Sequence, residues 1–159
     1  MFKIISGKKQ IDLNNITIKH DKDVSPDLIQ DLYLSVGWQY RDIQDIRGSL
    51  DNSVLVTTAW DEEKLIGIAR ATGDGIFSVT IWDVAVKPIY QKQGVGKLIL
   101  KSMLTKLDDC GIPLITLYVE WAKKDFYSKL GFETNINKVV GMYRYKNEPF
   151  RDKRNRRNE

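Results

Sequence analysis

The order of apolar and polar positions divides the chain into segments with helical spacing and segments with strand alternation. Residues 16–18 (Ile-Thr-Ile) alternate and predict a short strand. Ser25 and Pro26 follow in the order of a helix cap and a first helical residue. The helix that they open is expected to end at Gly37, and a second short helix is predicted over residues 42–50. The apolar positions at helical spacing in the first helix are Leu28, Ile29, Leu32 and Val36.

From residue 53 onward the apolar period becomes that of strands. Residues 53–60 and 64–71 flank a polar turn and predict a hairpin. Residues 78–86 are apolar on both faces, which predicts a strand inside the sheet rather than at an exposed edge. The order strand, helix, strand over residues 78–119 implies a parallel, right-handed crossover. The remaining predicted elements are a helix over residues 94–109, a strand over 114–119, a helix over 122–130 and a strand over 139–145.

The length of 159 residues fits one folded domain, and the net charge of +4 is concentrated at its end. Residues 144–159 contain seven Lys and Arg against three acidic side chains, so the rest of the chain is neutral. We therefore expect a folded domain over residues 1–146 and a basic, flexible tail over residues 147–159. Nucleic-acid binding is not favoured, because Phe150 is the only aromatic residue of this tail.

The counts of cysteine and histidine exclude several classes of site. One cysteine, Cys110, and one histidine, His20, cannot form an internal disulfide or a zinc site, and no loop typical of calcium binding occurs, so no metal is expected. We expect Cys110 to be buried as a small apolar residue. No apolar run approaches the ~20 residues of a membrane-spanning helix, and the first ten residues lack the apolar stretch of a signal peptide. We therefore expect that the protein is not inserted in a membrane and that it acts in the compartment where it is made.

Candidate chemistry appears where the strand over residues 78–86 leads to the next helix. Gly94 and Gly96 stand at the start of that helix, where glycine lets a ligand approach the backbone and the first amides have no acceptor within the helix. These features predict a phosphate site, with a plain strand-to-helix turn as the alternative. The dinucleotide-binding motif would need glycine in place of Ile99, and the motif G-x-x-x-x-G-K-[ST] of nucleotide hydrolases does not occur.

Two segments resemble the signatures of a known family. Residues 91–96 (Gln-Lys-Gln-Gly-Val-Gly) resemble the [RQ]-x-x-G-x-[GA] pyrophosphate loop of the GCN5-related N-acetyltransferases (GNAT). Residues 125–132 (Asp-Phe-Tyr-Ser-Lys-Leu-Gly-Phe) resemble their second signature, F-Y-x-x-L-G-F. The resemblance covers residues 16–145 and implies an α/β (α+β, three-layer) fold. In that fold a mixed, largely antiparallel sheet has splayed parallel central strands and is flanked by helices.

Three further segments narrow the resemblance within the family. Residues 35–38, 65–72 and 81–84 are similar to the cyanobacterial and plastid branch, which includes chloroplast acetyltransferases associated with serotonin, lysine and protein N-terminal acetylation. The resemblance implies transfer of acetyl from acetyl-CoA to a primary amine by direct nucleophilic attack. The amine is an arylalkylamine, a lysine side chain or a protein N-terminus. The implied location is the plastid stroma for an organelle-encoded protein and the bacterial cytoplasm otherwise.

The resemblance also implies where acetyl-CoA would bind. The backbone of Val84, Ala85 and Val86 would pair with the pantetheine arm like an added strand. The strands over residues 79–86 and 114–119 would part to admit it. The backbone amides that would hold the pyrophosphate are those of Gln91, Lys92, Gln93, Gly94, Val95, Gly96 and Lys97.

Three polar side chains are candidates for proton transfer in such a reaction. The phenol of Tyr127 can protonate the leaving thiolate, because the intrinsic pKa of a phenol is ~10 against ~8.5 for a thiol. Its alternative role is packing within its helix. Asp83 or Glu120 would take the proton of the ammonium group, directly or through water. The structural alternatives are that Asp83 bonds a neighbouring strand and that Glu120 caps the following helix.

Three aromatic residues, Trp38, Tyr40 and Trp82, are candidates for an acceptor pocket, because aromatic faces attract flat rings and ammonium groups. Packing in the core is the alternative.

A second function also stays open: a non-catalytic acetyl-CoA-binding or regulatory module that docks on RNA or protein through its basic tail. Glu120 favours it, because many family members have asparagine at that position. The strand predicted over residues 139–145 is available to pair with a second copy in a homodimer.

Overall fold

The chain forms two units, residues 1–124 and residues 125–159, which are described separately. The structure, a computed structural model, describes residues 10–134 and Met142. The strands of the first unit are β1 (Ile16–Lys19), β2 (Leu55–Asp61), β3 (Lys64–Gly73), β4 (Val79–Val86) and β5 (Ile115–Leu117). Its helices are α1 (Pro26–Ser35), α2 (Ile43–Asp51) and α3 (Val95–Asp109), with short 3-10 helices η1 (Leu13–Asn15), η2 (Pro88–Tyr90) and η3 (Trp121–Lys123).

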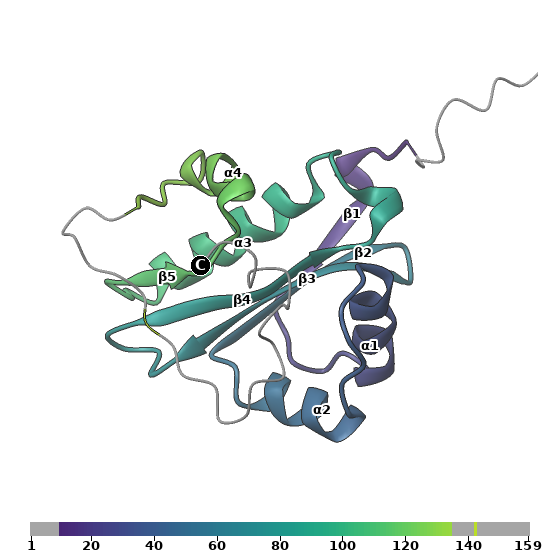
Figure 1. The fold of residues 1–159 in the computed structure, drawn as a ribbon, viewed down its shortest axis with the longest axis horizontal. Helices are drawn as coiled ribbons and strands as arrows, with labels where there is room; N and C mark the ends of the chain where they lie inside the picture. Colours follow the sequence, from purple (N-terminus) through teal and green to yellow (C-terminus); the bar gives the residue numbers. More distant parts are fainter. Residues whose placement is uncertain (1–9, 135–141, 143–159) are drawn as a thin grey trace, which may run out of the picture. The chain divides into compact units, whose positions relative to one another are not determined.

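A five-stranded mixed sheet forms the centre of the first unit (Figure 1). The strands lie side by side in sequence order, from β1 to β5. The pairings from β1 to β4 are antiparallel, and β4 and β5 are parallel. The predicted hairpin is β2–β3, and the predicted interior strand is β4, which lies between β3 and β5. The predicted fold class, a mixed and largely antiparallel sheet flanked by helices, is confirmed.

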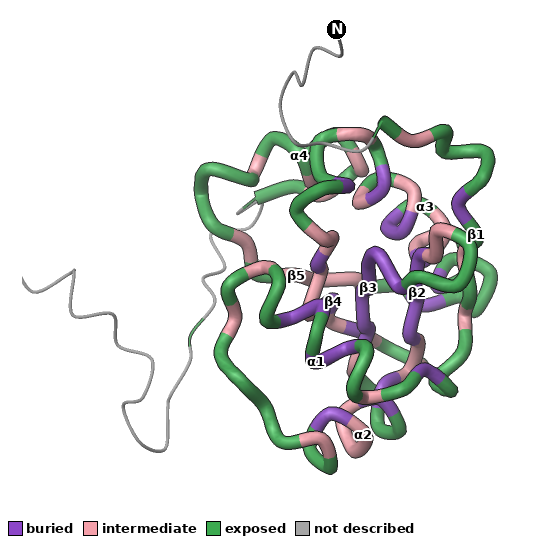
Figure 2. Tube along the Cα trace, turned by 90° about the vertical axis from the view of Figure 1, so that its right-hand side faces the viewer, coloured by how far each residue is buried: buried purple, intermediate pink, exposed green. Residues whose placement is uncertain are grey.

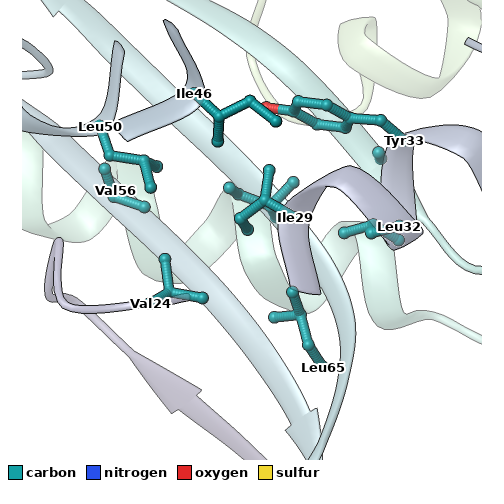
Figure 3. Close-up of a cluster of buried hydrophobic side chains, with 10 residues drawn as sticks. Val24, Ile29, Leu32, Tyr33, Ile46, Leu50, Val56 and Leu65 are labelled. Carbon is teal, nitrogen blue, oxygen red and sulfur yellow. The ribbon is translucent and has the colours of Figure 1, made fainter. Parts of the chain in front are cut away.

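Helices cover both faces of this sheet (Figure 2). α1 packs with α2 on one face, and α3 packs on the other across β2, β3 and β4. Each large apolar side chain buried between these layers contributes on the order of 1.5–3 kcal/mol to folding. The core cluster on the α1 side (Figure 3) consists of Val24, Ile29, Leu32, Tyr33, Ile46, Leu50, Val56, Leu65, Ile68 and Ala85.

Helix α1 turns a slightly different face to the sheet from the one predicted. It begins at Pro26 and is followed by Gly37 at φ +83°, as expected. Ile29 is fully buried, but Leu28 is 39% exposed and Tyr33 is buried instead. The phenol of Tyr33 has a polar partner within the sheet, Asp83, at 3.0 Å. Because burial of a tyrosine needs a hydrogen-bond partner for its hydroxyl, this bond explains why a tyrosine joins the inner face.

Helix α3 packs close to the sheet through a row of apolar side chains. The helical spacing of residues 94–109 predicts an inward face of Val95, Leu98, Ile99, Met103 and Leu107. All of these except Leu98 are buried, and Leu100 is buried as well. Cys110 directly follows the helix and is exposed, so the expectation that it is buried is wrong. Cys110 is the C-terminal cap residue of α3, and Gly111 follows it at φ +72°.

Gly67 sets how closely α3 approaches β3. A Cβ atom at this position would lie 2.6 Å from Cδ1 of Ile99 and 3.0 Å from the carbonyl oxygen of Ala85. We expect Gly67→Ala to lower the free energy of unfolding by about 1–3 kcal/mol, because the helix or the strand must shift. Chemical denaturation of the purified variant measures this change.

Gly48 supplies the matched control for that substitution. It lies within α2, and a Cβ atom there would meet no other atom within 4 Å. Gly48→Ala is expected to raise the free energy of unfolding by about 0.5–1 kcal/mol, because alanine has the higher helix propensity. Equal effects of the two substitutions would contradict the close packing at Gly67.

The second unit begins at Asp125, the second residue of the short helix α4 (Lys124–Ser128). The helix predicted over residues 122–130 is therefore split between η3 and α4. The chain leaves α4 through Gly131, whose φ of +93° suits glycine, and the amide of Leu130 donates to the carbonyl of Tyr127 at 2.9 Å. The predicted strand over residues 139–145 and the tail over 147–159 lie outside the described residues, apart from Met142.

Candidate active site

Strands β4 and β5 pair over a short distance and then part. The parallel register covers three residue pairs and ends at Ile81 and Leu117, whereas β4 continues to Val86. The hydroxyl groups of Thr80 and Thr116 lie 2.8 Å apart within the paired part. β5 is thus shorter than the strand predicted over residues 114–119. Along its last five residues β4 pairs with β3 only, as far as the chain is described, so its other edge faces no strand there.

A β-bulge lies at the point where β4 leaves β5. The register with β3 shifts between Ile68 and Arg70, which places Asp83 and Val84 together opposite one residue of β3. Asp83 has φ +52°, in the left-handed region that residues other than glycine rarely adopt. A bulge of this kind bends a strand and re-aims its side chains. It also stores strain, which surrounding contacts must hold in place.

The carboxylate of Asp83 is held mainly by Arg70 of the neighbouring strand. Nε and Nη2 of Arg70 lie 2.8 Å from Oδ2 of Asp83, and both side chains are about nine-tenths buried. Nη1 of Arg70 donates to the carbonyl of Ser49 at 3.0 Å and to Oγ of Ser53 at 2.9 Å. The bulge is therefore tied to the C-terminal part of α2. The structural alternative for Asp83, a bond to a neighbouring strand, is confirmed.

Two further groups complete this cluster from the α1 side. The hydroxyl of Tyr33 donates to Oδ2 of Asp83 at 3.0 Å, and Nη1 of Arg41 lies 3.2 Å from the same oxygen. The guanidinium of Arg41 stacks over the ring of Tyr33 at 4.7 Å and lies 5.6 Å from the ring of Trp38. The loop between α1 and α2 thus reaches the bulge of β4.

The charges of this cluster keep Asp83 ionised. Burial alone would raise the pKa of its carboxyl group, but the guanidinium groups of Arg70 and Arg41 outweigh burial and hold the pKa below its usual value. For Tyr33, burial and then the neighbouring Asp83 carboxylate raise the pKa of the phenol well above its usual value. Because its pKa is lowered and both of its oxygens are engaged, Asp83 is a weak proton acceptor.

The loop before α3 presents backbone amides. Gly94 has φ +95° and no side chain caps the helix at this position. The first helical bond runs from the amide of Leu98 to the carbonyl of Gly94 at 2.9 Å, so the amides of residues 95–97 have no acceptor within the helix. Oε1 of Gln93 accepts from the amide of Ile11 at 3.2 Å, which fixes the loop. Uncapped amides at the positive end of a 15-residue helix fit a phosphate group.

The three aromatic candidates lie in different surroundings. Trp82 is 42% exposed and stacks on the exposed ring of Tyr118 at 5.5 Å, directly beyond the last pair of β4 and β5. Trp38 is partly buried and packs at 5.0 Å against Tyr33, so the core alternative holds for part of its ring. Tyr40 is 66% exposed.

Glu120 lies three residues beyond the end of β5 and is exposed. Its carboxylate lies 3.1 Å from Nζ of Lys123, and its backbone carbonyl accepts from the amide of Lys123 at 2.8 Å. Glu120 thus occupies the cap position of η3, but its side chain does not bond the helix amides. The carboxylate is accessible to solvent and remains a candidate base.

Tyr127 belongs to the second unit, where it packs among aromatic rings. Its ring meets the edge of Phe126 at 5.0 Å and of Phe132 at 6.2 Å. Both neighbours belong to the F-Y-x-x-L-G-F segment, so the signature builds a local aromatic cluster around this tyrosine. The side chain is partly buried. Its role as proton donor stays a prediction.

Comparison with known proteins bears on these features. Residues 52–134 match the sequence profile of the family described as "Acetyltransferase (GNAT) domain". A Pyropia yezoensis protein designated N-acetyltransferase ycf52 is 34% identical over 140 residues, which covers 86% of this chain and 80% of that protein. The chain belongs to the GNAT acetyltransferase family. It is therefore an acetyl-CoA-dependent N-acetyltransferase.

Two further GNAT proteins support this assignment. "GCN5-related N-acetyltransferase 2, chloroplastic" of Arabidopsis thaliana is 36% identical over 137 residues, which covers 74% of this chain and 53% of that protein. The solved structure of a GNAT-family acetyltransferase from Streptococcus pneumoniae superimposes with a TM-score of 0.71 and 30% identity, and the match covers 84% of this chain and 98% of that chain. The resemblance found in the sequence, including its plastid branch, is confirmed.

GNAT enzymes use acetyl-CoA as the acetyl donor, and its chemistry can be compared with the open edge of β4 and the uncapped start of α3. Acetyl-CoA has an extended pantetheine arm with two amides and a pyrophosphate, which fit a strand edge and a helix N-terminus respectively.

Among the described residues no cluster of three or more His, Cys, Asp or Glu could hold a metal ion. Within the same residues, no helix is long and apolar enough to cross a bilayer.

Two residues that contact Asp83, Arg41 and Arg70, were not predicted from the sequence. Arg70 is the one charged residue of the apolar segment 65–71, and Asp83 is the one charged residue of the apolar segment 79–86. Opposite charges in adjacent apolar strands are a signal of a buried ion pair. Arg41 carries no such signal, because a charged residue in a loop is the ordinary case.

Proposed function

We propose that this GNAT enzyme transfers acetyl from acetyl-CoA to a primary amine by direct attack of the amine on the thioester, next to the bulge of β4. The observation that carries the proposal is that β4 continues from Trp82 to Val86 beyond its last pair with β5 and then leads to an uncapped helix. An unpaired strand edge followed by free amides offers an acyl carrier hydrogen bonds along its whole length.

The backbone of residues 84–86 would bind the pantetheine amides, and the amides of residues 91–97 would bind the pyrophosphate. The carbonyl of Val86 now accepts from Nε2 of Gln91 at 2.8 Å, a bond that a pantetheine amide would replace. Lys92 and Lys97 add positive charge to this end of the site. Gly94 adopts φ +95° without strain, which lets the loop present these amides at the start of α3.

The reaction requires an amine to lose its proton, attack the thioester carbonyl and expel a thiolate that is then protonated. Tyr127 is the proposed proton donor to the thiolate. Glu120 is the proposed base, directly or through water, because its carboxylate is exposed. Asp83 stays an anion and holds the bulge. Trp38, Tyr40 and Trp82 are the proposed contacts of the acceptor.

The acceptor class is a primary amine: an arylalkylamine, a lysine side chain or a protein N-terminus. We place the enzyme in the plastid stroma or in a bacterial cytoplasm, because relatives such as the Arabidopsis protein are described as chloroplastic. The domain is proposed to cover residues 1–146, with a basic tail over residues 147–159 that has no part in transfer. Pairing of two copies through residues 139–145 is the proposed route to a homodimer.

Calorimetric titration with acetyl-CoA tests where the donor binds. We expect saturable binding with one molecule per chain, weakened about tenfold or more by Gly94→Ala. The added Cβ atom would lie 2.8 Å from Cδ1 of Leu13 and would strain a residue at φ +95°, which displaces the loop amides.

Gly111→Ala is the matched control, because Gly111 also has a positive φ (+72°) but lies at the other end of α3 with no atom near its Cβ position. It is expected to lower stability to a similar degree and to leave acetyl-CoA affinity unchanged. Absence of saturable binding to the unaltered protein would overturn the proposed function. Equal loss of affinity in both variants would overturn the placement of the pyrophosphate.

A further inference from the structure

Two guanidinium groups meet one carboxylate at the bulge of β4. Arg70 makes the closer contacts with Asp83, at 2.8 Å from two nitrogens, and its side chain is 11% exposed. The contacts of Arg41 with the same carboxylate are longer, at 3.2–3.4 Å, and its side chain is 42% exposed. Arg70 is thus the inner partner that neutralises Asp83, and Arg41 is the outer one.

The guanidinium of Arg41 is oriented by aromatic rings. It lies over Tyr33 at 4.7 Å and near Trp38 at 5.6 Å, which limits the rotation of its plane. Its Nη1 and Nη2 bond Asp83, while its Nε has no acceptor among residues 10–134. An oriented guanidinium with unused N–H groups is suited to bind a second carboxylate.

The cluster carries one surplus positive charge. Two arginines, Arg70 and Arg41, form ion pairs with Asp83, so the formal charge summed over the three side chains is +1. The acidic neighbour Asp42 does not cancel it by direct contact, because its carboxylate accepts from the amide of Gln44 at 2.8 Å as the cap of α2. The surplus charge faces solvent at Arg41, beside the bulge where the proposed function places the reacting carbonyl.

We propose that Arg41 determines acceptor specificity: the enzyme prefers amines that carry a carboxylate close to the reactive nitrogen. This inference rests on the proposed function, which brings the amine to the bulge of β4. A group next to the amine then lies within reach of Arg41. A carboxylate gains a charge-assisted, forked hydrogen bond there, whereas a second ammonium group meets the surplus positive charge. Polyamines and basic peptides are accordingly poor acceptors.

Acetylation of matched acceptors tests this preference. The panel contains peptides that differ only in Asp, Asn or Lys at the second position, together with tyrosine and its amide as a free amino-acid pair. We expect kcat/KM to be about tenfold higher for the acidic peptide than for the Asn peptide, and lowest for the Lys peptide. The rates for tyrosine and its amide show whether the α-carboxylate of a free amino acid has the same effect as the side-chain carboxylate of a peptide. The acidic preference is expected to shrink at 0.5 M salt, because Arg41 is partly exposed.

Variants assign the preference to this residue. Arg41→Gln is expected to reduce the ratio between the acidic and the Asn peptide to about one, and this ratio is read within the same variant, so that any change in its overall activity cancels. Arg41→Lys keeps the charge without the fork and is expected to retain part of the ratio. Lys64→Gln removes the same charge from the exposed start of β3 and is expected to leave the ratio unchanged.

The outcomes separate the inference from the proposed function. Equal rates for all acceptors in the unaltered enzyme, or a ratio that persists in Arg41→Gln, would overturn the role of Arg41 alone. Acetyl-CoA binding without transfer to any member of the panel would overturn the inference, and absence of transfer to tryptamine as well would overturn the proposed transfer to amines. If Lys64→Gln also abolishes the ratio between the acidic and the Asn peptide, the preference follows the net charge of the protein, and the role of Arg41 is overturned.

Discussion

Tyr127→Phe is expected to lower kcat about 100-fold and to leave the affinity for acetyl-CoA within about twofold. A general acid contributes roughly 10²- to 10⁴-fold to a transfer of this kind, and phenylalanine keeps the ring while it removes the proton. The ring contacts with Phe126 at 5.0 Å and Phe132 at 6.2 Å do not need the hydroxyl, so the aromatic cluster is expected to persist. Steady-state kinetics with a saturating amine, together with calorimetry, separate the two quantities.

Tyr90→Phe is the control for the loss of a phenol elsewhere. The hydroxyl of Tyr90 donates to Oδ2 of Asp61 at 2.7 Å, so this variant is expected to lose some thermal stability and to keep kcat. A kcat for Tyr127→Phe that equals that of the unaltered enzyme would remove Tyr127 from the mechanism. The packing alternative for this tyrosine would then be the correct one.

Much of the fold could be predicted because burial follows the periodicity of the chain. The alternation before and after the turn at residues 61–63 predicted the β2–β3 hairpin, and the apolar run over residues 78–86 predicted an interior strand, β4. Periodicity does not say how far a pair of strands stays together. β5 ends at Leu117 because its pairing with β4 ends there, and no residue type in the segment 114–119 indicates this.

The polar cluster around Asp83 could not be predicted from periodicity, because it depends on the register between β3 and β4. Asp83 reaches Arg70 through a bulge that shifts the pairing by one residue, and one residue decides which face a side chain takes. His20 illustrates the same limit. Its ring nitrogens lie 3.0 Å from Oγ1 of Thr57 and 2.8 Å from Oγ of Ser102, partners 37 and 82 residues away in the sequence. Only the assembled layers bring these groups together.

Asp83→Ala is expected to lower the free energy of unfolding by about 3–5 kcal/mol at neutral pH. The substitution leaves Arg70 buried without its carboxylate and places an alanine at φ +52°. The lowered pKa of Asp83 fixes the sign of the pH dependence. The ion pair stabilises the unaltered protein above the unfolded-state pKa of about 4, and this contribution is lost as pH falls through the lower folded-state pKa. Denaturation at pH 7 and pH 3 measures both effects.

Asp74→Ala is the control for the loss of an aspartate from a turn. Asp74 accepts from the amides of Ile76, Phe77 and Ser78 but is exposed, so its removal is expected to lower the free energy of unfolding by much less than the removal of Asp83. An equal effect of the Asp83 and Asp74 substitutions would contradict the buried ion pair.

The double variant Arg70→Met, Asp83→Gly separates positioning from proton transfer. Glycine adopts φ +52° without strain and methionine fills the space of the arginine stem without a charge, so much of the lost stability is expected to return. If Asp83 only holds the bulge, kcat also recovers toward that of the unaltered enzyme, and the acid limb of its pH profile stays in place because it belongs to another group. If Asp83 is the base, every variant without its carboxylate loses the same factor in kcat, whatever its stability. The pH profile therefore decides between the two roles.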